Sequence, residues 1–161
     1  MKLNVPYYSQ RVDVVDPEWR AHSCLVICIK MMTEFLNNEK ISADNWIKEG
    51  VYIGAWDGKF WKHNEAVRLF RNHGIFAYSQ EFRTVNVDLK NGDFNNGINS
   101  ELFLNNGIEK IAKKIDDGLP TMVSIYKYFT EKYRHHAIVI VGYERNNDRT
   151  LKGFYYQDPE M

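Results

Sequence analysis

The stretch from Ser23 to Leu36, SCLVICIKMMTEFL, constrains the fold most, because it is apolar on most of the circumference of a helix. Its few polar side chains include Lys30, Thr33 and Glu34, and with Asn37 they recur at spacings of three and four residues. This spacing gathers them into one narrow stripe. The sequence therefore predicts a central, buried helix against which the rest of the chain packs.

A cysteine is expected at the first position of this helix. Ser23 is a favourable N-cap, because its hydroxyl can accept a hydrogen bond from a free backbone N–H of the first turn. Cys24 then feels the positive end of the helix dipole and the free amides, which favour the nucleophilic thiolate. The alternative is that Cys24 is one more small buried apolar residue.

Turn residues and hydrophobic periodicity divide the remaining chain into further elements. Before residue 75 they predict an extended segment at Leu3–Gln10, helices at Ser42–Gly50 and Asn64–His73, and an aromatic loop at Val51–Trp61. After it they predict a strand at Ile75–Phe82, an exposed loop at Asn91–Asn99, a helix at Ile108–Ile115, and strands at Thr121–Tyr126, His136–Glu144 and Phe154–Gln157. Helices followed by an antiparallel meander indicate the α+β class.

Length and charge limit the class of protein. A chain of 161 residues is most simply one domain. Lysine plus arginine and aspartate plus glutamate both number 21, so no basic face is implied and no nucleic-acid partner is expected. The longest apolar runs fall well short of the ~20 residues that a membrane-spanning helix needs.

The cellular compartment depends on the chain start. The opening residues, MKLNVPYYSQ, lack the apolar region of a signal peptide. The protein is expected to be cytoplasmic if Met1 is the native start, and secreted if a signal peptide has been removed. Two cysteines four residues apart, Cys24 and Cys28, do not form a disulfide framework.

Candidate chemistry lies at the ends of the predicted strands. His136 begins HAIVIVGYE, whose apolar residues on both faces predict a central strand. His135 and His136 should point to opposite faces, so they cannot share one metal or one nucleophile. Asp158 follows the last strand, and pairing of the last two strands would bring it beside His136. With Cys24 these residues would form a nucleophile, a base and an orienting acid; the alternatives are a structural histidine and a plain Asp–Pro turn.

Several motifs then resemble one family. In order along the chain they are VPYYSQ, W-x-x-x-x-C at the start of an apolar helix, HAIVIVGYE and QDP. The segments ISADNWIKEG and WKHNEAVRLFRNHGI also resemble the two short helices between the cysteine and the histidine. Nearly the whole chain is similar to the bacteriocin-processing cysteine peptidases that cleave double-glycine leaders, above all to their stand-alone relatives. The resemblance implies a papain-like α+β fold, with N-terminal helices and a buried helix carrying Cys24 packed on a C-terminal antiparallel sheet.

The resemblance also implies an activity and the residues that carry it. Cys24 would be the nucleophile, His136 the general base, Asp158 the orienting acid, and Gln10 the side-chain amide of the oxyanion hole. The implied reaction is hydrolysis of a peptide bond through an acyl-enzyme, with no cofactor and no metal. The implied partner is a peptide or protein substrate, with small residues such as glycine near the scissile bond as one option.

Two other functions remain open from the sequence. The family usually has glycine directly after the cysteine and a shorter gap before it, where this chain has Leu25 and a longer gap from Gln10 to Cys24. These differences suit a catalytically silent papain-like fold that binds a peptide or protein. In a third interpretation, the aromatic loop Val51–Trp61 is a contact surface of an interaction domain.

A zinc site is not expected. The chain has no His-Glu-x-x-His motif, and Cys24 and Cys28 form an i, i+4 pair without convincing partners. His22, His63 and His73 are expected at the surface or in packing. His22, close to Cys24 in sequence, is the alternative base.

The chain end sets a further expectation. Asp158 lies three residues before Met161, and terminal residues are poorly ordered unless something docks them. An orienting acid must nevertheless hold the imidazole in one geometry. The two demands agree only if the strand Phe154–Gln157 is firmly paired or the chain has been cut from a longer one. We predict a domain spanning residues 1–161 that is truncated at its C-terminus, with a mobile Asp158.

Overall fold

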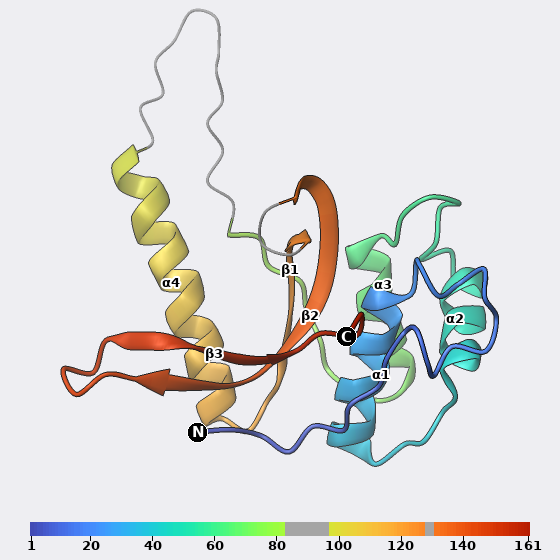
Figure 1. Cartoon of the computed structure of the whole chain (residues 1–161), viewed down its shortest axis with the longest axis horizontal. Helices are drawn as coiled ribbons and strands as arrows, with labels where there is room; N and C mark the ends of the chain where they lie inside the picture. The colour runs from blue at the N-terminus through green and yellow to red at the C-terminus, as the bar shows by residue number, and fades with distance from the viewer. Residues whose placement is uncertain (83–96, 128–130) are drawn as a thin grey trace, which may run out of the picture.

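The computed structural model describes residues 1–82, 97–127 and 131–161 (Figure 1). Within these residues the elements follow in the order α1 (Cys24–Asn37), α2 (Ala43–Tyr52), α3 (His63–Asn72), α4 (Gly97–Asp116), β1 (Thr121–Lys127), β2 (Glu131–Arg145) and β3 (Leu151–Gln157). Helices precede strands, so the predicted α+β class is confirmed.

The three strands form one antiparallel sheet in the order β1-β2-β3, as the predicted meander requires. Ile125 of β1 pairs with His136, and Gln157 of β3 pairs with Val139. All three strands are longer than predicted, and β2 begins five residues before His136. The sequence rule misses these ends because polar residues there pair through their backbones without an apolar pattern.

The central strand β2 is covered on both faces. Ala137, Val139 and Val141 are buried in a core that they share with α1. Ile138 and Ile140 are buried on the opposite face, together with Ile115 of α4. Figure 1 shows the same layers, with α4 on one side of the sheet and α1, α2 and α3 on the other.

Helix α1 is the predicted central helix. Its apolar residues from Leu25 to Ile29 and Met31 are almost entirely buried. The polar stripe is also enclosed except at Asn37: Lys30 bonds Glu34 at 3.0 Å, and the Tyr8 hydroxyl donates to the same Glu34 oxygen at 2.8 Å. The ammonium lies 3.6 Å from the centre of the Tyr8 ring. The N-terminal extended segment is therefore fastened along the polar side of α1.

The two helices that follow α1 differ from the prediction only at their ends. The Ser42 side chain accepts a hydrogen bond from the Asn45 amide and so caps α2 at the predicted helix start. Helix α2 continues two residues past Gly50. Gly50 does not end it, because its missing side chain makes room for the Trp61 ring, which would lie 2.7 Å from a Cβ at this position.

The predicted strand at Ile75–Phe82 is wrong. Ile75 and Ala77 pack against the core while Phe76 and Tyr78 are exposed, which gives the alternation typical of a strand. The segment forms no ladder with β1, β2 or β3, and the Arg71 guanidinium donates to the Ala77 carbonyl instead. Alternating burial can therefore arise from packing on a helical layer alone.

Helix α4 begins at Gly97, eleven residues before the predicted start. Residues 97–99 of the predicted loop belong to it, and residues 91–96 of that loop lie outside the described part of the chain. Gly107 falls inside the helix because the Phe82 ring packs closely against it; a Cβ there would lie 2.8 Å from the ring. Gly118, with φ +79°, lies two residues after the helix end.

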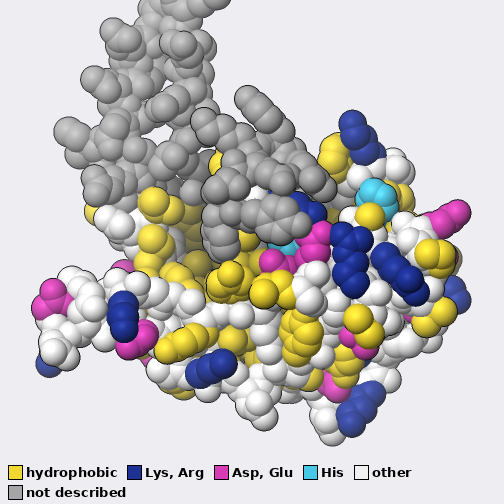
Figure 2. All heavy atoms as spheres, viewed as in Figure 1, with side chains coloured by type: hydrophobic (Ala, Val, Ile, Leu, Met, Phe, Trp, Pro, Cys, Tyr) yellow, Lys and Arg dark blue, Asp and Glu magenta, His cyan; other side chains and the backbone are white. Residues whose placement is uncertain are grey.

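Charges are mixed on the surface. Figure 2 shows acidic, basic and hydrophobic side chains interspersed over the described part of the visible face. Within residues 1–82, 97–127 and 131–161, no helix has both the length and the apolar character needed to cross a bilayer.

Candidate active site

Cys24 is the first residue of α1, as predicted, and it is partly exposed. The predicted side-chain cap is wrong: Ser23 has ψ near 8° rather than an extended conformation, and its buried hydroxyl has no partner among the described residues. Its carbonyl still accepts the Ile27 amide at 2.9 Å. Free amides at the first turn therefore remain next to the Cys24 side chain.

Cys28 lies one turn further along α1 and differs from Cys24 in environment. It is fully buried. Burial raises the pKa of the Cys28 thiol well above its usual value, and the charges of Cys24 and Asp158 add to this rise. A thiol held in its neutral form is a poor nucleophile.

His136 is buried in β2, whereas the adjacent His135 is exposed and lies 5.6 Å from the Tyr126 ring. The two imidazoles therefore differ in environment, as the strand geometry predicts. His136 is the one whose pKa responds to Cys24 at the start of α1.

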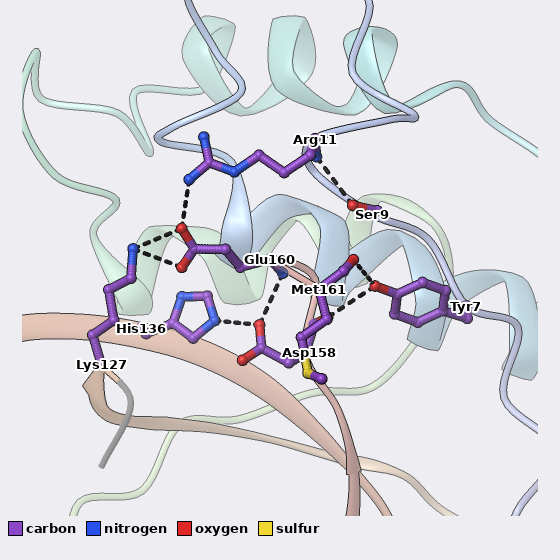
Figure 3. A network of polar contacts seen from close by, with 8 residues as sticks. All are labelled: Tyr7, Ser9, Arg11, Lys127, His136, Asp158, Glu160 and Met161. Atoms are coloured by element: carbon purple, nitrogen blue, oxygen red, sulfur yellow. Dashed lines mark hydrogen bonds and ion pairs between the residues drawn. The ribbon is translucent and has the colours of Figure 1, made fainter. Parts of the chain in front are cut away.

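Asp158 contacts the same imidazole from the other side. Gln157 ends β3 opposite Val139, so the next residue comes alongside the earlier part of β2. His136 Nε2 and Asp158 Oδ1 are 2.6 Å apart (Figure 3). Because Nε2 is engaged by the carboxylate, Nδ1 is the ring nitrogen that remains for Cys24. The predicted pairing of the last two strands does bring Asp158 beside His136.

The protonation of His136 follows from these two partners. Burial lowers its pKa, but hydrogen bonds with Cys24 and Asp158, together with their negative charges, raise it to about 9. A ring with this pKa keeps its proton at neutral pH while a negatively charged partner is present. This is the protonation state that a thiolate–imidazolium pair requires.

In the structure the end of the chain is docked by several contacts around Asp158. The Glu160 amide donates to Asp158 Oδ1 at 2.8 Å, and the Tyr7 hydroxyl contacts the carbonyl oxygens of Asp158, at 3.1 Å, and of Met161 (Figure 3). The paired strand β3 supplies the remaining support. The firmly paired strand is one of the two conditions under which Asp158 could orient a histidine, and the truncation stays a prediction.

Gln10 is buried and lies against the same turn. Its backbone N–H donates to the Pro159 carbonyl at 2.7 Å. Its side-chain Oε1 is buried without a hydrogen-bond partner among the described residues. The structure therefore brings the Gln10 backbone next to the residue that follows Asp158, with a side chain that the surrounding fold leaves incompletely bonded.

Leu25, which stands where the resembling family has glycine, is buried in the core that α1 shares with the sheet. Its side chain is 2% exposed, so it takes no space at the surface beside Cys24. The leucine is accommodated by packing, and the partial exposure of Cys24 is retained.

The other histidines described here lie in different surroundings. His22 is exposed and lies 5.7 Å from the Trp56 ring, and its carbonyl accepts the Trp61 indole N–H at 2.6 Å. His73 is hydrogen-bonded to Glu39 and Glu49. Among the described residues, no three histidine, cysteine or acidic side chains are grouped so as to hold a metal ion.

The aromatic loop Val51–Trp61 folds back on itself. Trp56 and Trp61 form a β-bridge with ring centres 5.1 Å apart, and Trp19 packs on both rings at 5.3 and 5.9 Å. Phe60 remains 62% exposed. The two tryptophans of this loop therefore form a local cluster with Trp19, which precedes α1, while Tyr52 and Phe60 remain exposed.

Sequence reasoning missed an ionic cluster beside the candidate residues. The Glu160 carboxylate contacts both Arg11 and Lys127 (Figure 3). Arg11 and Glu160 are 149 positions apart in the sequence, so no local pattern could have paired them. The only sequence signal for this cluster is position. Arg11 follows Gln10, Glu160 lies two residues after Asp158, and Lys127 ends β1.

Comparison with known proteins supports one assignment. Neither the curated proteins nor the solved structures include a significant match to this chain. The family profile described as "Peptidase_C39 like family" matches residues 2–161, which is almost the whole sequence. With a papain-like α+β fold of helices followed by an antiparallel sheet, the chain belongs to the Peptidase_C39 like family.

Proposed function

We propose that the protein is a cysteine peptidase that hydrolyses peptide bonds through Cys24, His136 and Asp158. The observation that carries this proposal is the position of the His136 ring, which lies 2.6 Å from Asp158 and whose pKa is raised by both Cys24 and Asp158. A nucleophile, a base and an orienting acid in this order are the requirements of acyl transfer to a side chain. Family membership supports the same class of activity.

In the first half-reaction, the Cys24 sulfur attacks the carbonyl carbon of the scissile peptide bond as a thiolate. The carbon–sulfur bond forms while the carbonyl oxygen takes up the negative charge. The C–N bond then breaks, and His136 gives its proton to the leaving amine. The products of this half-reaction are the released amine fragment and a thioester on Cys24.

The developing oxyanion needs hydrogen-bond donors. The Cys24 backbone N–H is suited to this role, because an amide at the first helical position has no acceptor within the helix. The Gln10 side-chain amide is the second donor in this proposal. Its support is that Gln10 is buried beside the Asp158–Pro159 turn, where its backbone N–H bonds the Pro159 carbonyl.

In the second half-reaction, water attacks the thioester carbonyl. The neutral His136 ring takes a proton from the water, and Asp158 stabilises the imidazolium that forms. The carbon–sulfur bond breaks, the acid fragment leaves, and the thiolate–imidazolium pair is restored. The net reaction is hydrolysis of one amide bond, with no other reactant than water.

The proposal is tested by incubating the protein with a peptide library that includes Gly-Gly sequences, and by identifying cleavage products by mass spectrometry. Cys24→Ser is the matched control, because it keeps the side-chain shape and removes the thiol. We expect cleavage by the wild type alone. Absence of cleavage by a folded wild type, combined with reversible peptide binding that Cys24→Ser retains, would support a peptide-binding module instead.

A further inference from the structure

The C-terminal turn after β3 carries an ion cluster whose carboxylate is almost enclosed. Glu160 Oε1 lies 2.5 Å from an Arg11 guanidinium nitrogen, and Glu160 Oε2 lies 2.6 Å from Lys127 Nζ. The Glu160 and Lys127 side chains are only 10% and 11% exposed, whereas Arg11 is 47% exposed. We call the contact of Glu160 with these two cations the Glu160 clamp.

The clamp joins the segments that carry Gln10 and Asp158 to β1, the strand that pairs with the His136 strand. Arg11 directly follows Gln10, and Glu160 lies two residues after Asp158. Lys127 ends β1, the strand that pairs with His136 through Ile125. Figure 3 shows the Glu160 side chain reaching between Arg11 and Lys127 while the backbone of the same residue meets Asp158.

The backbone of Glu160 connects the clamp directly to the orienting acid. Its N–H donates to Asp158 Oδ1 at 2.8 Å, and this is the same oxygen that bonds His136 Nε2. Any movement of the Glu160 backbone therefore changes the direction from which the carboxylate approaches the imidazole. The Pro159 carbonyl in the same turn accepts the Gln10 backbone N–H. The segment that carries Gln10 and the segment that carries Asp158 therefore meet at this turn.

Glu160 is charged over the range in which a thiol enzyme works. Burial raises its pKa, but hydrogen bonds and charges from Lys127 and Arg11 outweigh burial and lower the pKa. An enclosed ion pair is screened by solvent far less than an exposed one. Neutralising the carboxylate would leave the Lys127 ammonium without this counter-charge in a poorly solvated position, which favours rearrangement of the turn.

We infer that Glu160 is a positioning residue: clamped by Arg11 and Lys127, it fixes the turn that presents the Asp158 carboxylate to His136 and keeps Gln10 beside it. This inference rests on the proposed function for its effect on turnover. Its effect on the His136 ring does not depend on turnover, because it concerns only the Asp158–imidazole contact.

The first test uses the titration of His136, followed by NMR of its ring protons, in the full chain carrying Cys24→Ser. This background removes the thiolate, so the remaining shift of the His136 pKa reports the Asp158 contact. We expect Glu160→Gln to move the titration to lower pH. Glu144→Gln is the matched control, because it removes the same charge from β2, where Glu144 pairs with Lys152 at 3.0 Å and both are half-exposed. The control should leave the titration unchanged.

The second test measures peptide hydrolysis in the chain with Cys24 intact. Glu160→Gln should lower kcat by up to about 10²-fold with KM little changed, the size of loss expected when a catalytic group is slightly misplaced. The alkaline limb of the pH profile should move to lower pH, in step with His136. Glu160→Asp, which keeps the charge on a shorter side chain, should recover part of the loss.

The outcomes separate the two proposals. An unchanged His136 titration in a folded Glu160→Gln chain overturns the positioning role, even if the melting temperature falls. A shifted titration in a chain that hydrolyses nothing supports the positioning role and counts against the peptidase. If Glu160→Gln does not fold, Arg11→Gln replaces it, because Arg11 is half-exposed and its loss leaves the Lys127 contact in place; an unchanged titration there overturns the proposal as well.

Discussion

Two histidines of this protein, His136 and His73, each bridge two side chains, and each has a raised pKa. Burial lowers the pKa of His73, but hydrogen bonds and charges from Glu49 and Glu39 raise it overall. Its ring nitrogens lie 2.8 Å from Glu49 and 2.9 Å from Glu39, and its ring packs 4.3 Å from Trp46. His136 has the same arrangement with one difference, because Cys24 takes the place of one carboxylate.

Because of this one difference, the proton on His73 can only hold the fold together, whereas the proton on His136 can take part in a reaction. A carboxylate has no use as a nucleophile toward an amide at these positions, so a proton held by His73 only joins Glu39, which follows α1, to Glu49 of α2. A thiol beside an imidazole can give up its proton and attack a carbonyl. A raised histidine pKa in a buried cluster therefore identifies an active site only when one of the partners is reactive.

The largest expected effect comes from removing the reactive partner. Cys24→Ala should lower kcat by at least about 10⁴-fold, as expected when a member of a catalytic group is lost. His73→Gln should leave kcat per folded molecule unchanged. The measurement is peptide hydrolysis normalised to folded protein by circular dichroism. Equal losses in the two variants would remove the functional difference between the two histidines.

The next effect concerns Gln10, the proposed oxyanion donor beside His136. Gln10→Ala should lower kcat by about 10²–10³-fold with KM little changed, because an oxyanion donor acts in the transition state. The melting temperature should stay nearly constant, since the Gln10 backbone bond to Pro159 is retained. A lower melting temperature with full turnover per folded molecule would show that Gln10 only fastens the N-terminal segment.

Most of the fold was predictable because its signals are local. The apolar surface of α1 and the two-faced apolar run from Ala137 to Val141 both appear in short windows of sequence, and both mark buried elements. The position of Gly107 inside α4 and the absence of a strand at Ile75–Phe82 were not predictable, because both depend on distant partners. Phe82 packs on the glycine inside α4, and Arg71 takes the Ala77 carbonyl that a strand would have shared.

The candidate site was predictable to the extent that it follows from strand pairing and from family resemblance. Cys24, His136 and Asp158 come from motifs, and the register of β2 and β3 explains how the last two meet. The Glu160 clamp was not predictable, because its contacts join positions 11, 127 and 160 through the folded chain. At Ser23 the sequence predicted a contact that is not formed. The residue type suits a helix cap, but its backbone conformation keeps the hydroxyl from bonding a free N–H of the first turn.

A smaller effect is expected from the two cysteines. Iodoacetamide should alkylate Cys24 at least about tenfold faster than Cys28 near pH 6, because Cys28 is fully buried and burial raises its thiol pKa. Peptide mapping by mass spectrometry resolves the two sites. His136→Ala should reduce this ratio and His73→Gln should not. Slow and equal labelling of both cysteines would indicate that the histidine beside Cys24 does not activate it.

The smallest effect is on the pH dependence of stability, and it concerns His73. A histidine whose folded pKa lies above the unfolded value of about 6.5 stabilises the protein fully below that pH, and this contribution is lost as pH rises through the folded pKa. His73 therefore adds stability in acid that declines above about pH 6.5. Hydrogen bonds between charged groups suggest a cost of about 1–3 kcal/mol for His73→Gln near pH 6.

His136 complicates this measurement, because its pKa of about 9 gives a loss of stability of the same sign between about pH 6.5 and pH 9. The informative quantity is therefore the difference in unfolding free energy between wild type and His73→Gln, measured by urea denaturation across pH 5 to 9 at about 0.15 M salt. The His136 contribution is common to both proteins and cancels in this difference. The difference should shrink steadily as pH rises. A difference independent of pH would mean that His73 is held by packing on Trp46 alone, and that its two glutamates contribute no more than exposed ion pairs do.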